Sequence, residues 1–419
     1  MTPFEELLSR PYAQELAARL VRYARIGTTS DRHAEGTPST QNQWDLARLL
    51  MTELKGLGVA DAELDGRCYL IARLPASPGL ESAPSVGLMA HMDTASDVPG
   101  DGVRPRVVEG YDGRKLQLGA DAHLDPADYP DLAGHAGDTI IVTDGSTLLG
   151  ADDKAGLAEI MTLAAWLIGH PEIRHGPLEL VFTPDEETGK GMDLFPLERL
   201  RSKVCYTMDG GKAGEIEAEC FTAYAVKAEF KGRAIHIGSA RGKLANAVSM
   251  AGSFVSMLPR SEAPESTDGW YGYYCPLEMS GGLEKAQVEV FLRDFTQKGM
   301  DSRIAAVRAI AAAVEAQFPL GSVALTVTKQ YLNMREKLDE RPEVLERAME
   351  AARRAGAEPA IKPIRGGTDG ARLTELGVPC PNIFTGGHNY HSRHEWASVS
   401  EMALAVGTLI ELVGLWAAR

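Results

Sequence analysis

The sequence predicts an α/β fold in which a mostly parallel sheet is covered by helices and a smaller α+β domain is inserted into the chain. Short, mainly apolar segments alternate with helical patterns in the first half, and this alternation returns after residue 331. Between residues 220 and 330, apolar and polar residues instead alternate one by one. Parallel strands buried on both faces are apolar throughout, whereas antiparallel strands exposed on one face alternate. We therefore expect one domain from 1–219 and 331–419, and an inserted domain from 220–330.

The elements of the first domain follow from apolar runs and from helical stripes. Helices are expected near 13–23, 42–57, 153–167 and 343–355, and strands near 69–74, 85–90, 178–183, 204–208 and 382–384. A last helix begins at Ser398-Val399-Ser400-Glu401, a capping-box pattern. Its apolar stretch is interrupted by Thr408 and Glu411, so we expect a packed helix and no membrane span.

The inserted domain is predicted to be an antiparallel sheet covered by two helices. Apolar residues alternate with polar ones around 224–230, 288–292 and 323–327, as they do in half-exposed strands. In 244–258 and 304–318 the apolar residues instead recur at helical spacing. Each of these two helices then has one apolar stripe, which can cover one face of the small sheet.

The composition is that of a soluble globular protein, with 44% hydrophobic and 24% charged residues among 419. The formal charge of −15 argues against a nucleic-acid partner and against docking on an anionic membrane. The five cysteines form no CxxC pair, and the N-terminal segment lacks a secretory pattern. We therefore expect a reducing, cytoplasmic setting.

Acidic and imidazole side chains follow the predicted strands at their carboxyl ends. They are His91 and Asp93 after 85–90, Glu186 and Glu187 after 178–183, Asp209 after 204–208, Asp152 at the start of a helix, and His391 after 382–384. Each one alone is more often a turn former, a helix cap or a solvated surface group. The carboxyl ends of parallel strands meet at one edge of a sheet, and carboxylates gather there around positive charge. The pattern therefore predicts a site for two divalent metal ions.

The expected ligands are two neutral imidazoles and three carboxylates, namely His91, Asp152, Glu187, Asp209 and His391. Such a set without a thiolate suits zinc, manganese or cobalt, with one carboxylate bridging two ions about 3.5–4 Å apart. Three negative charges against four positive ones favour a metal-bound hydroxide as the nucleophile. Asp93, two residues after His91, is expected to fix the imidazole, and Glu186 to act as the general base.

Six segments, spread in order over nearly the whole chain, form one recognisable pattern. They are His91-Met92-Asp93-Thr94, Gly150-Ala151-Asp152-Asp153-Lys154, Thr183-Pro184-Asp185-Glu186-Glu187, Asp209-Gly210-Gly211, Arg365-Gly366-Gly367-Thr368-Asp369-Gly370, and His391 to Glu395. Together they resemble the peptidase T family of co-catalytic dizinc peptidases, which remove the N-terminal residue from tripeptides. The resemblance implies two divalent metals per chain, zinc foremost, and short peptides as substrates.

The resemblance also implies a role for individual residues. Asp152 would bridge the metals and Glu186 would be the base, with Glu187 a ligand. His391, and neither His388 nor His394, would be the last ligand. A cis peptide bond is expected between Asp152 and Asp153.

Further implied roles fall outside the metal ligands. The segment Gly232-Arg233-Ala234-Ile235-His236 resembles a lid whose histidine, here His236, stabilises the tetrahedral oxyanion. Arg293 and Arg365 resemble the residues that hold the carboxyl end of the substrate, and Asn246 is a further substrate candidate. For Arg293, an ordinary exposed strand arginine is the competing interpretation.

Two positions depart from the family, and both bear on substrate fit. Ile237 stands where proline is typical, and His388 stands where tyrosine is frequent. The resemblance leaves open a homodimer formed through the lid domain, and whether His236 acts in its own subunit or a neighbouring one.

Two alternatives remain at this point. A related dizinc dipeptidase, carboxypeptidase or N-acyl-amino-acid deacylase would share the metal ligands. A non-catalytic peptide-binding protein would not need them, and the presence of all five ligands with Glu186 argues against it. The sequence contains no GxSxG, GxxxxGK[ST] or HExxH motif, and no GxGxxG after a strand.

Overall fold

The computed structural model describes residues 2–418, which form two compact units. Among the described residues, the first unit comprises 2–218, Glu336–Lys362 and 368–418, and the second comprises Glu219–Arg335 and Pro363–Gly367. The short segment Pro363–Gly367 belongs to the second unit although the chain on either side of it belongs to the first, a feature that the sequence did not predict.

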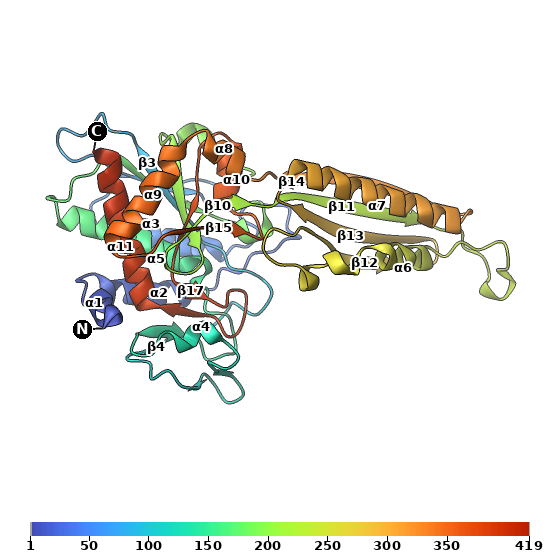
Figure 1. Cartoon of the computed structure of the whole chain (residues 1–419), viewed down its shortest axis with the longest axis horizontal. Coiled ribbons are helices and arrows are strands. Elements are labelled where there is room, and N and C mark those ends of the chain that lie inside the picture. Colours follow the sequence, from blue (N-terminus) through green and yellow to red (C-terminus); the bar gives the residue numbers. More distant parts are fainter. Residues whose placement is uncertain (1, 419) are drawn as a thin grey trace. The chain divides into compact units, whose positions relative to one another are not determined.

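The first unit is built on an eight-stranded mixed sheet (Figure 1). Its strand order is β1 (Asp61–Leu64), β2 (Leu70–Leu74), β8 (Leu178–Thr183), β3 (Val86–His91), β9 (Val204–Gly210), β16 (Asn382–Phe384), β10 (Glu215–Cys220) and β15 (Ala360–Ile364). The four central strands β8, β3, β9 and β16 are parallel, whereas β1, β2 and β10 pair antiparallel with their neighbours. The predicted fold class is confirmed. The parallel strands β3, β8 and β16 are buried at every residue, and β9 at every residue except Asp209.

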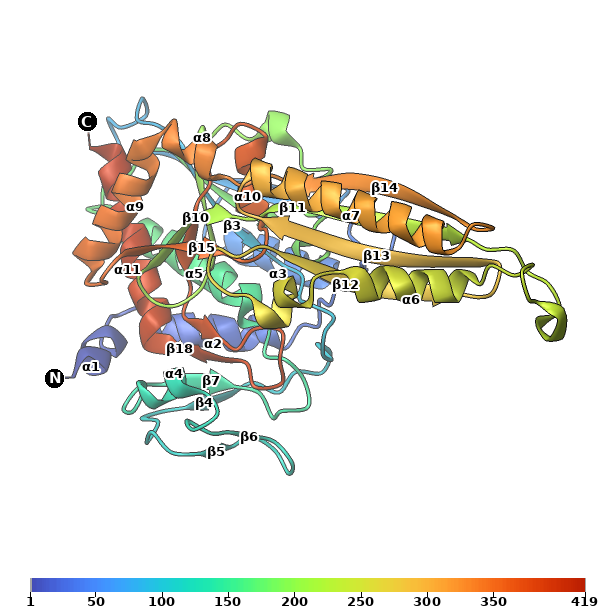
Figure 2. The same cartoon turned by 45° about the vertical axis from the view of Figure 1, so that its right-hand side comes forward.

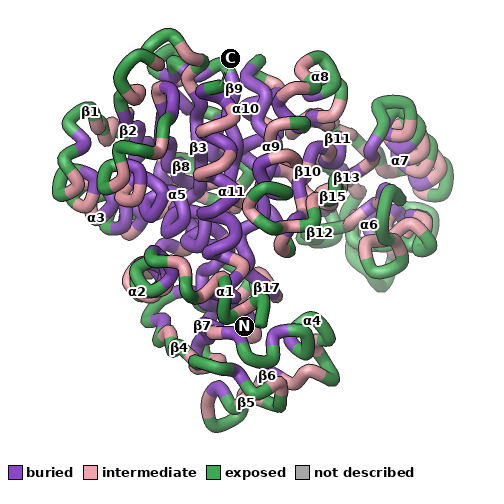
Figure 3. Tube along the Cα trace, turned by 60° about the vertical axis from the view of Figure 1, so that its left-hand side comes forward, coloured by how far each residue is buried: buried purple, intermediate pink, exposed green. Residues whose placement is uncertain are grey.

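Helices α3 (Gln43–Gly56), α5 (Ala151–Gly169) and α10 (Asp369–Glu375) contact strands of this sheet. The other helices of this part of the protein are α1 (Pro3–Leu8), α2 (Ala13–Ala24), α4 (Pro130–Ala133), α8 (Arg335–Asp339), α9 (Pro342–Ala355) and α11 (Val399–Ala417). Helix α5 contacts β3 and β9 as well as α2 and α11. Because it lies between the sheet and other helices, it is buried along most of its length (Figure 3).

Helix α11 begins at Val399 with Ser398 as its N-cap, as the sequence predicts. Among residues 2–418 it alone is long and apolar enough to cross a membrane, and 72% of that apolar stretch is buried inside the protein. Burial of this kind is what a core helix shows, and it explains why the helix is apolar on most sides.

A smaller sheet lies in the first unit and was not predicted. It contains β17 (Gly387–His388), β18 (Trp396–Ser398), β7 (Ile140–Val142) and β4 (Arg106–Val108), and the hairpin β5 (Leu116–Gln117) and β6 (His123–Leu124) lies in the same part of the chain. Trp396 is fully buried in the hydrophobic cluster of this region. The loop between β17 and β18 contains His391, so this sheet holds both ends of that loop.

The second unit is a four-stranded antiparallel sheet with two helices (Figure 2). Its strand order is β12 (Tyr273–Gly281), β13 (Lys285–Asp294), β11 (Thr222–Lys231) and β14 (Ser322–Tyr331), and the helices are α6 (Ala247–Met257) and α7 (Gln297–Gln317). Both helices contact β11 and β13 and also each other, so they cover the same face. Strand β12 was not predicted from the sequence, since most of its residues are exposed and it contains Pro276.

Candidate metal centre

The predicted metal-ligand side chains of the first unit come together at the carboxyl ends of its parallel strands. His91 is the last residue of β3, and Asp209 lies near the end of β9. Glu187 belongs to the one-turn 3-10 helix η1 (Glu186–Thr188), which follows β8. Because β8, β3 and β9 are adjacent and parallel, their ends lie at one edge of the sheet. Asp152, in the first turn of α5, and His391, in the β17–β18 loop, complete the group.

Asp152 occupies the middle of this group. Its Oδ1 lies 2.9 Å from Nε2 of His91, and its Oδ2 lies 3.2 Å from Nε2 of His391. On the first side, Oδ1 of Asp209 is 3.8 Å from the same His91 nitrogen. On the other side, Oε1 of Glu187 is 3.1 Å from the His391 nitrogen. The group therefore has two halves, each with one imidazole and one further carboxylate, and both share Asp152.

Asp93 holds the imidazole and the paired glutamates in place. Nδ1 of His91 lies 3.1 Å from the backbone oxygen of Asp93 and 3.5 Å from its Oδ1. The two carboxylate oxygens of Asp93 accept the backbone N–H groups of Glu186 at 2.9 Å and Glu187 at 3.2 Å. A ring whose Nδ1 is engaged in this way presents Nε2 outwards as a ligand.

Asp185 shapes the turn that presents the paired glutamates. Its backbone is left-handed, with φ at 61°, an uncommon conformation for a residue with a Cβ. Its buried carboxylate accepts the N–H and hydroxyl of Ser39 and the side-chain amide of Gln43, which lies in the first turn of α3. These bonds fix the turn, so the direction of Glu186 and Glu187 is set by a helix far away in sequence.

Two more carboxylates were not assigned roles from the sequence. Glu395 is buried and accepts the backbone N–H groups of Leu149, Gly150 and Asp152 at 2.7, 2.7 and 3.1 Å. Asp153, joined to Asp152 by a cis peptide bond, accepts the backbone N–H groups of His91 and Gly156. Both side chains therefore position the segment that contains Asp152.

The spacing of Glu395 from His391 is a sequence signal that could have identified Glu395 as a residue of the site. Glu395 follows His391 by four positions in a loop rich in polar residues. The role of Asp153 depends on its contact with His91 on a separate strand, which no local pattern shows.

The electrostatics of the group reflect many carboxylates close together. Burial and the negative charge of Asp152 together raise the pKa of Glu187 to about 7, although the contact with His391 acts in the opposite direction. Burial likewise raises the pKa of Asp209 well above its usual range. Burial alone would lower the pKa of His391, but the carboxylates of Asp152 and Glu187 raise it to about 11. The neighbouring carboxylates thus raise the pKa of an imidazole that must be deprotonated to bind a metal, so metal binding here would release a proton.

The residues present fit a pair of divalent cations. Neutral imidazole and carboxylate are the ligands of zinc, manganese and cobalt sites. Ligand atoms of His91, Asp152 and Glu187 lie within 4.8 Å of one another, as do those of His91, Asp153 and Asp209. Oε1 of Glu187 is buried, and the contact that the structure gives it is Nε2 of His391 at 3.1 Å, itself a proposed ligand. A buried carboxylate oxygen in that state is suited to a cation.

The four candidates for substrate contacts lie in the second unit, namely His236, Asn246, Arg293 and Arg365. Two of them form hydrogen bonds within that unit. The guanidinium of Arg365 donates to the backbone oxygens of Thr267, Gly269 and Tyr271. The Asn246 side chain caps helix α6, accepting the backbone N–H groups of Val248 and Ser249. Both residues therefore have clear structural roles.

The other two candidates, Arg293 and His236, differ in their exposure to solvent. Arg293 is 7% exposed on β13 and lies over the rings of Phe291 and Tyr331, so the alternative of an ordinary exposed strand arginine is wrong. His236 is exposed in the segment between β11 and α6, and Ile237 beside it is 71% exposed. An exposed imidazole next to an exposed apolar side chain is available for contact with another molecule.

Comparison with known proteins identifies relatives of the whole chain. The model of peptidase family M20/M25/M40 matches residues 142–414. A protein from Geobacillus sp. (strain WCH70) named peptidase T is 44% identical over 404 residues, which are 96% of this chain and 98% of that protein. The match therefore extends over nearly the whole of both chains.

Solved structures share the fold. The aminopeptidase PepT from Bacillus cereus ATCC 10987 superposes with a TM-score of 0.74 at 23% identity, over 97% of this chain and 99% of that one. A Bacillus subtilis protein described as a dinuclear metal binding peptidase from the M20 family superposes with a TM-score of 0.65 at 14% identity, over 96% and 98%.

Proposed function

Since the chain belongs to peptidase family M20/M25/M40, we propose that it is a metallo-aminopeptidase that removes the N-terminal residue from tripeptides. That the chain is a peptidase follows from its family. The tripeptide substrate is proposed from relatives of 44% identity named peptidase T. We propose the cytoplasm as its location.

One observation carries the metal-dependent mechanism. The two oxygens of Asp152 face two different imidazoles, at 2.9 and 3.2 Å. We propose that His91, Asp209, Glu187 and His391 would hold two divalent ions, with Asp152 as the ligand that both ions would share. When bound, such ions polarise a peptide carbonyl and lower the pKa of water to near neutrality.

Glu186 is proposed as the general base. Its backbone N–H is bonded to Asp93, which places it beside the ligand Glu187. Burial raises the pKa of its carboxyl well above the usual range, and the charge of Asp209 acts in the same direction. A carboxylate of raised pKa can take a proton from the attacking water and pass it to the leaving amine. Water then adds to the carbonyl carbon, the C–N bond breaks, and the amine leaves with that proton.

The residues of the second unit are proposed to complete the substrate site. His236 would donate a hydrogen bond to the oxyanion of the tetrahedral intermediate, an interaction worth roughly 3–4 kcal/mol. Arg293 and Arg365 would hold the carboxyl end of the peptide, and Asn246 would contact it through its amide N–H groups. We also propose a homodimer formed through this unit, which the exposed side chain of Ile237 favours.

A chelation experiment tests the metal dependence. Dialysis against a chelator should abolish cleavage of a tripeptide such as Ala-Ala-Ala, and added zinc should restore it. Full activity after chelation, with metal analysis showing that both ions have left, would contradict the proposal. It would also contradict the assignment of His91, Asp152, Glu187, Asp209 and His391 as catalytic metal ligands.

Product analysis tests the substrate class. Matched di-, tri- and tetrapeptides with free or blocked ends are each incubated with the metal-loaded enzyme. An aminopeptidase releases the N-terminal residue and needs a free amine. A carboxypeptidase would release the opposite end, and a deacylase would act on the blocked amine. A peptide-binding protein would retain peptides and release no product.

A further inference from the structure

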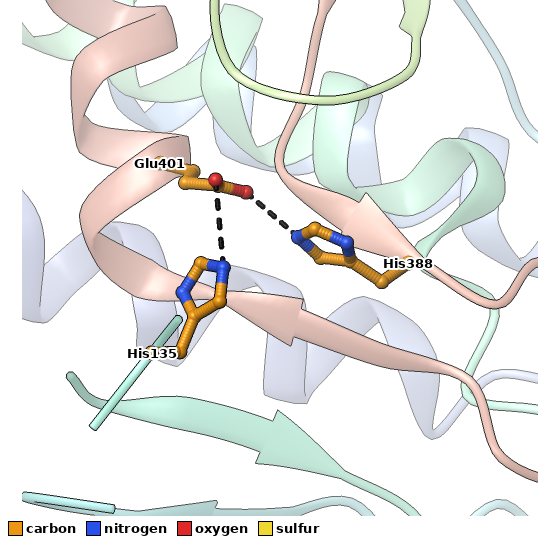
Figure 4. A group of neighbouring side chains, drawn as sticks. All are labelled: His135, His388 and Glu401. Atoms are coloured by element: carbon orange, nitrogen blue, oxygen red, sulfur yellow. Dashed lines mark hydrogen bonds and ion pairs between the residues drawn. The ribbon is translucent and has the colours of Figure 1, made fainter. Parts of the chain in front are cut away.

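A second group of ligand-type side chains lies in the first unit (Figure 4). His135 follows α4, His388 is in β17, and Glu401 is in the first turn of α11. Nε2 of His388 lies 2.8 Å from Oε2 of Glu401, and Nε2 of His135 lies 3.6 Å from Oε1. The two imidazoles therefore present the same nitrogen to opposite oxygens of one carboxylate. None of the three residues belongs to the group around Asp152.

The ring of His135 is oriented by a buried carboxylate. Its Nδ1 lies 3.1 Å from Oδ2 of Asp138, which is fully buried. That oxygen also accepts hydrogen bonds from the hydroxyls of Ser398 and Ser400. A carboxylate bonded to Nδ1 fixes the tautomer that leaves Nε2 free as a ligand, an arrangement found behind metal-binding histidines.

Trp396 holds both imidazoles in place by packing. The ring of His388 lies parallel to it, with centroids 3.9 Å apart and an interplanar angle of 4°. The ring of His135 meets it edge-on at 4.9 Å. Both histidines are less than a tenth exposed. The three-residue group is therefore held in its arrangement by its own surroundings.

Glu401 does not serve the helix in the way its sequence pattern suggests. In a capping box its carboxylate would return to the backbone N–H of Ser398. That N–H instead donates to the backbone oxygen of Gly386, and the carboxylate of Glu401 turns to the imidazoles. The Ser398 hydroxyl still caps the backbone N–H of Glu401.

We propose that His135, His388 and Glu401 bind a divalent transition-metal ion at a site separate from the one around Asp152. Two imidazoles and one carboxylate suit zinc, cobalt or nickel, and three protein ligands leave a fourth position for water. Metal–ligand bonds of about 2.0–2.2 Å place the ligand atoms of a tetrahedral site about 3.3–3.6 Å apart. The 3.6 Å between His135 and Glu401 matches this spacing, whereas the 2.8 Å hydrogen bond between His388 and Glu401 would lengthen by roughly 0.5 Å when an ion replaces the shared proton. With Asp138 behind His135, two negative charges balance the ion.

Such an ion would connect segments that are distant in sequence. It would join the chain after α4 to β17 and to the start of α11. His391 lies three residues after His388, so the ion would also hold one end of the loop that contains His391. We therefore assign this site a structural role, and its occupancy does not depend on the proposed peptidase activity.

Zinc content measured by mass spectrometry tests the site on the full-length chain. The wild type, His388→Gln and Glu401→Gln are equilibrated with zinc and passed through a desalting column. Each variant should retain one ion fewer per chain than the wild type. His170→Gln is the matched control, because His170 also stacks on a tryptophan, Trp166, at 3.6 Å. It should retain as many ions as the wild type.

The same measurement on Asp152→Asn separates this site from the catalytic one. Loss of the bridging carboxylate should leave one ion per chain, and adding His388→Gln should remove it. If the proposed catalytic centre held no metal, the wild type would bind one ion and His388→Gln would still lose it. Equal zinc content in the wild type, His388→Gln and Glu401→Gln would overturn the proposal and leave the group as a hydrogen-bonded network.

Crystals of the wild-type protein soaked in zinc provide a test without substitutions. An anomalous difference map should show a peak between His135, His388 and Glu401. A map with peaks beside Asp152 alone would overturn the proposal.

Discussion

The carboxylate of Asp93 accepts the backbone N–H of Glu186 at 2.9 Å, while the backbone oxygen of Asp93 lies 3.1 Å from Nδ1 of His91. One residue thus sets the direction of a proposed metal ligand and the position of the proposed base. The ligand His91 ends strand β3, whereas Glu186 lies in the 3-10 helix that follows β8, so the hydrogen bonds of Asp93 set their relative placement.

Substituting Asp93 should therefore impair the site without unfolding the protein. In Asp93→Asn one oxygen becomes an NH₂ group, which cannot accept the N–H of Glu186 or Glu187. We expect metal affinity or kcat/KM to fall about 10–100-fold. Zinc competition and steady-state kinetics measure the two effects. Asp112→Asn, in an exposed loop, is the control. Wild-type values for both quantities in Asp93→Asn would refute the positioning role.

Glu186→Gln tests the base directly. The amide keeps the size of the side chain but cannot take a proton, so kcat should fall by about 10²–10⁴. The metal content should stay at the wild-type value, because Glu186 is not a proposed ligand. A variant with normal kcat would remove Glu186 from the mechanism, and one that loses metal would make it a ligand.

The fold could be predicted in segments long enough to show a periodic pattern of apolar residues. The parallel strands are mainly apolar and the strands β11, β13 and β14 alternate, so both sheets were recognised. The sheet around β7 and β18 was missed because strands of two or three residues show no period. Strand β12 was missed because its exposed residues carry no burial pattern.

The candidate site was predictable to the extent that its residues follow strands. His91, Glu187 and Asp209 could be located in this way, and the structure places them near Asp152 and His391. The roles of Asp185 and Glu395 arise from contacts with α3 and with the chain before Asp152, which are tertiary. Local sequence does not encode such contacts. The sequence pattern at Ser398–Glu401 predicted a capping box, and the contact of Glu401 with His388 could not be foreseen because it too is tertiary.

Glu217 should make stability depend on pH. Burial in β10, together with the charge of Glu215, raises the pKa of its carboxyl to about 8. The folded protein then holds this proton more tightly than the unfolded chain, whose glutamates titrate near pH 4.5. The stabilising contribution is present in full below about pH 4.5 and is lost as the pH rises towards 8.

Comparing variants isolates this contribution. The free energy of unfolding, measured with urea from pH 4.5 to 8.5, should fall less steeply with pH in Glu217→Gln than in the wild type. Glu15→Gln, on the exposed side of α2, should keep the wild-type slope. Identical slopes in the wild type and Glu217→Gln would show that Glu217 is ionised in the folded protein.

His236 is the residue of the second unit with a proposed role in the reaction itself, and a substitution tests that role. Removing its imidazole in His236→Ala should lower kcat by about 10²–10³ and leave the metal content unchanged, because the residue lies outside the group around Asp152. Loss of metal would refute the assignment to the oxyanion. In a homodimer, mixing this variant with Glu186→Gln decides which subunit supplies the imidazole. If it comes from the neighbouring subunit, mixed dimers contain one complete site and activity returns to roughly a quarter of the wild-type value. If each subunit uses its own His236, every site in the mixture lacks one group and no activity returns.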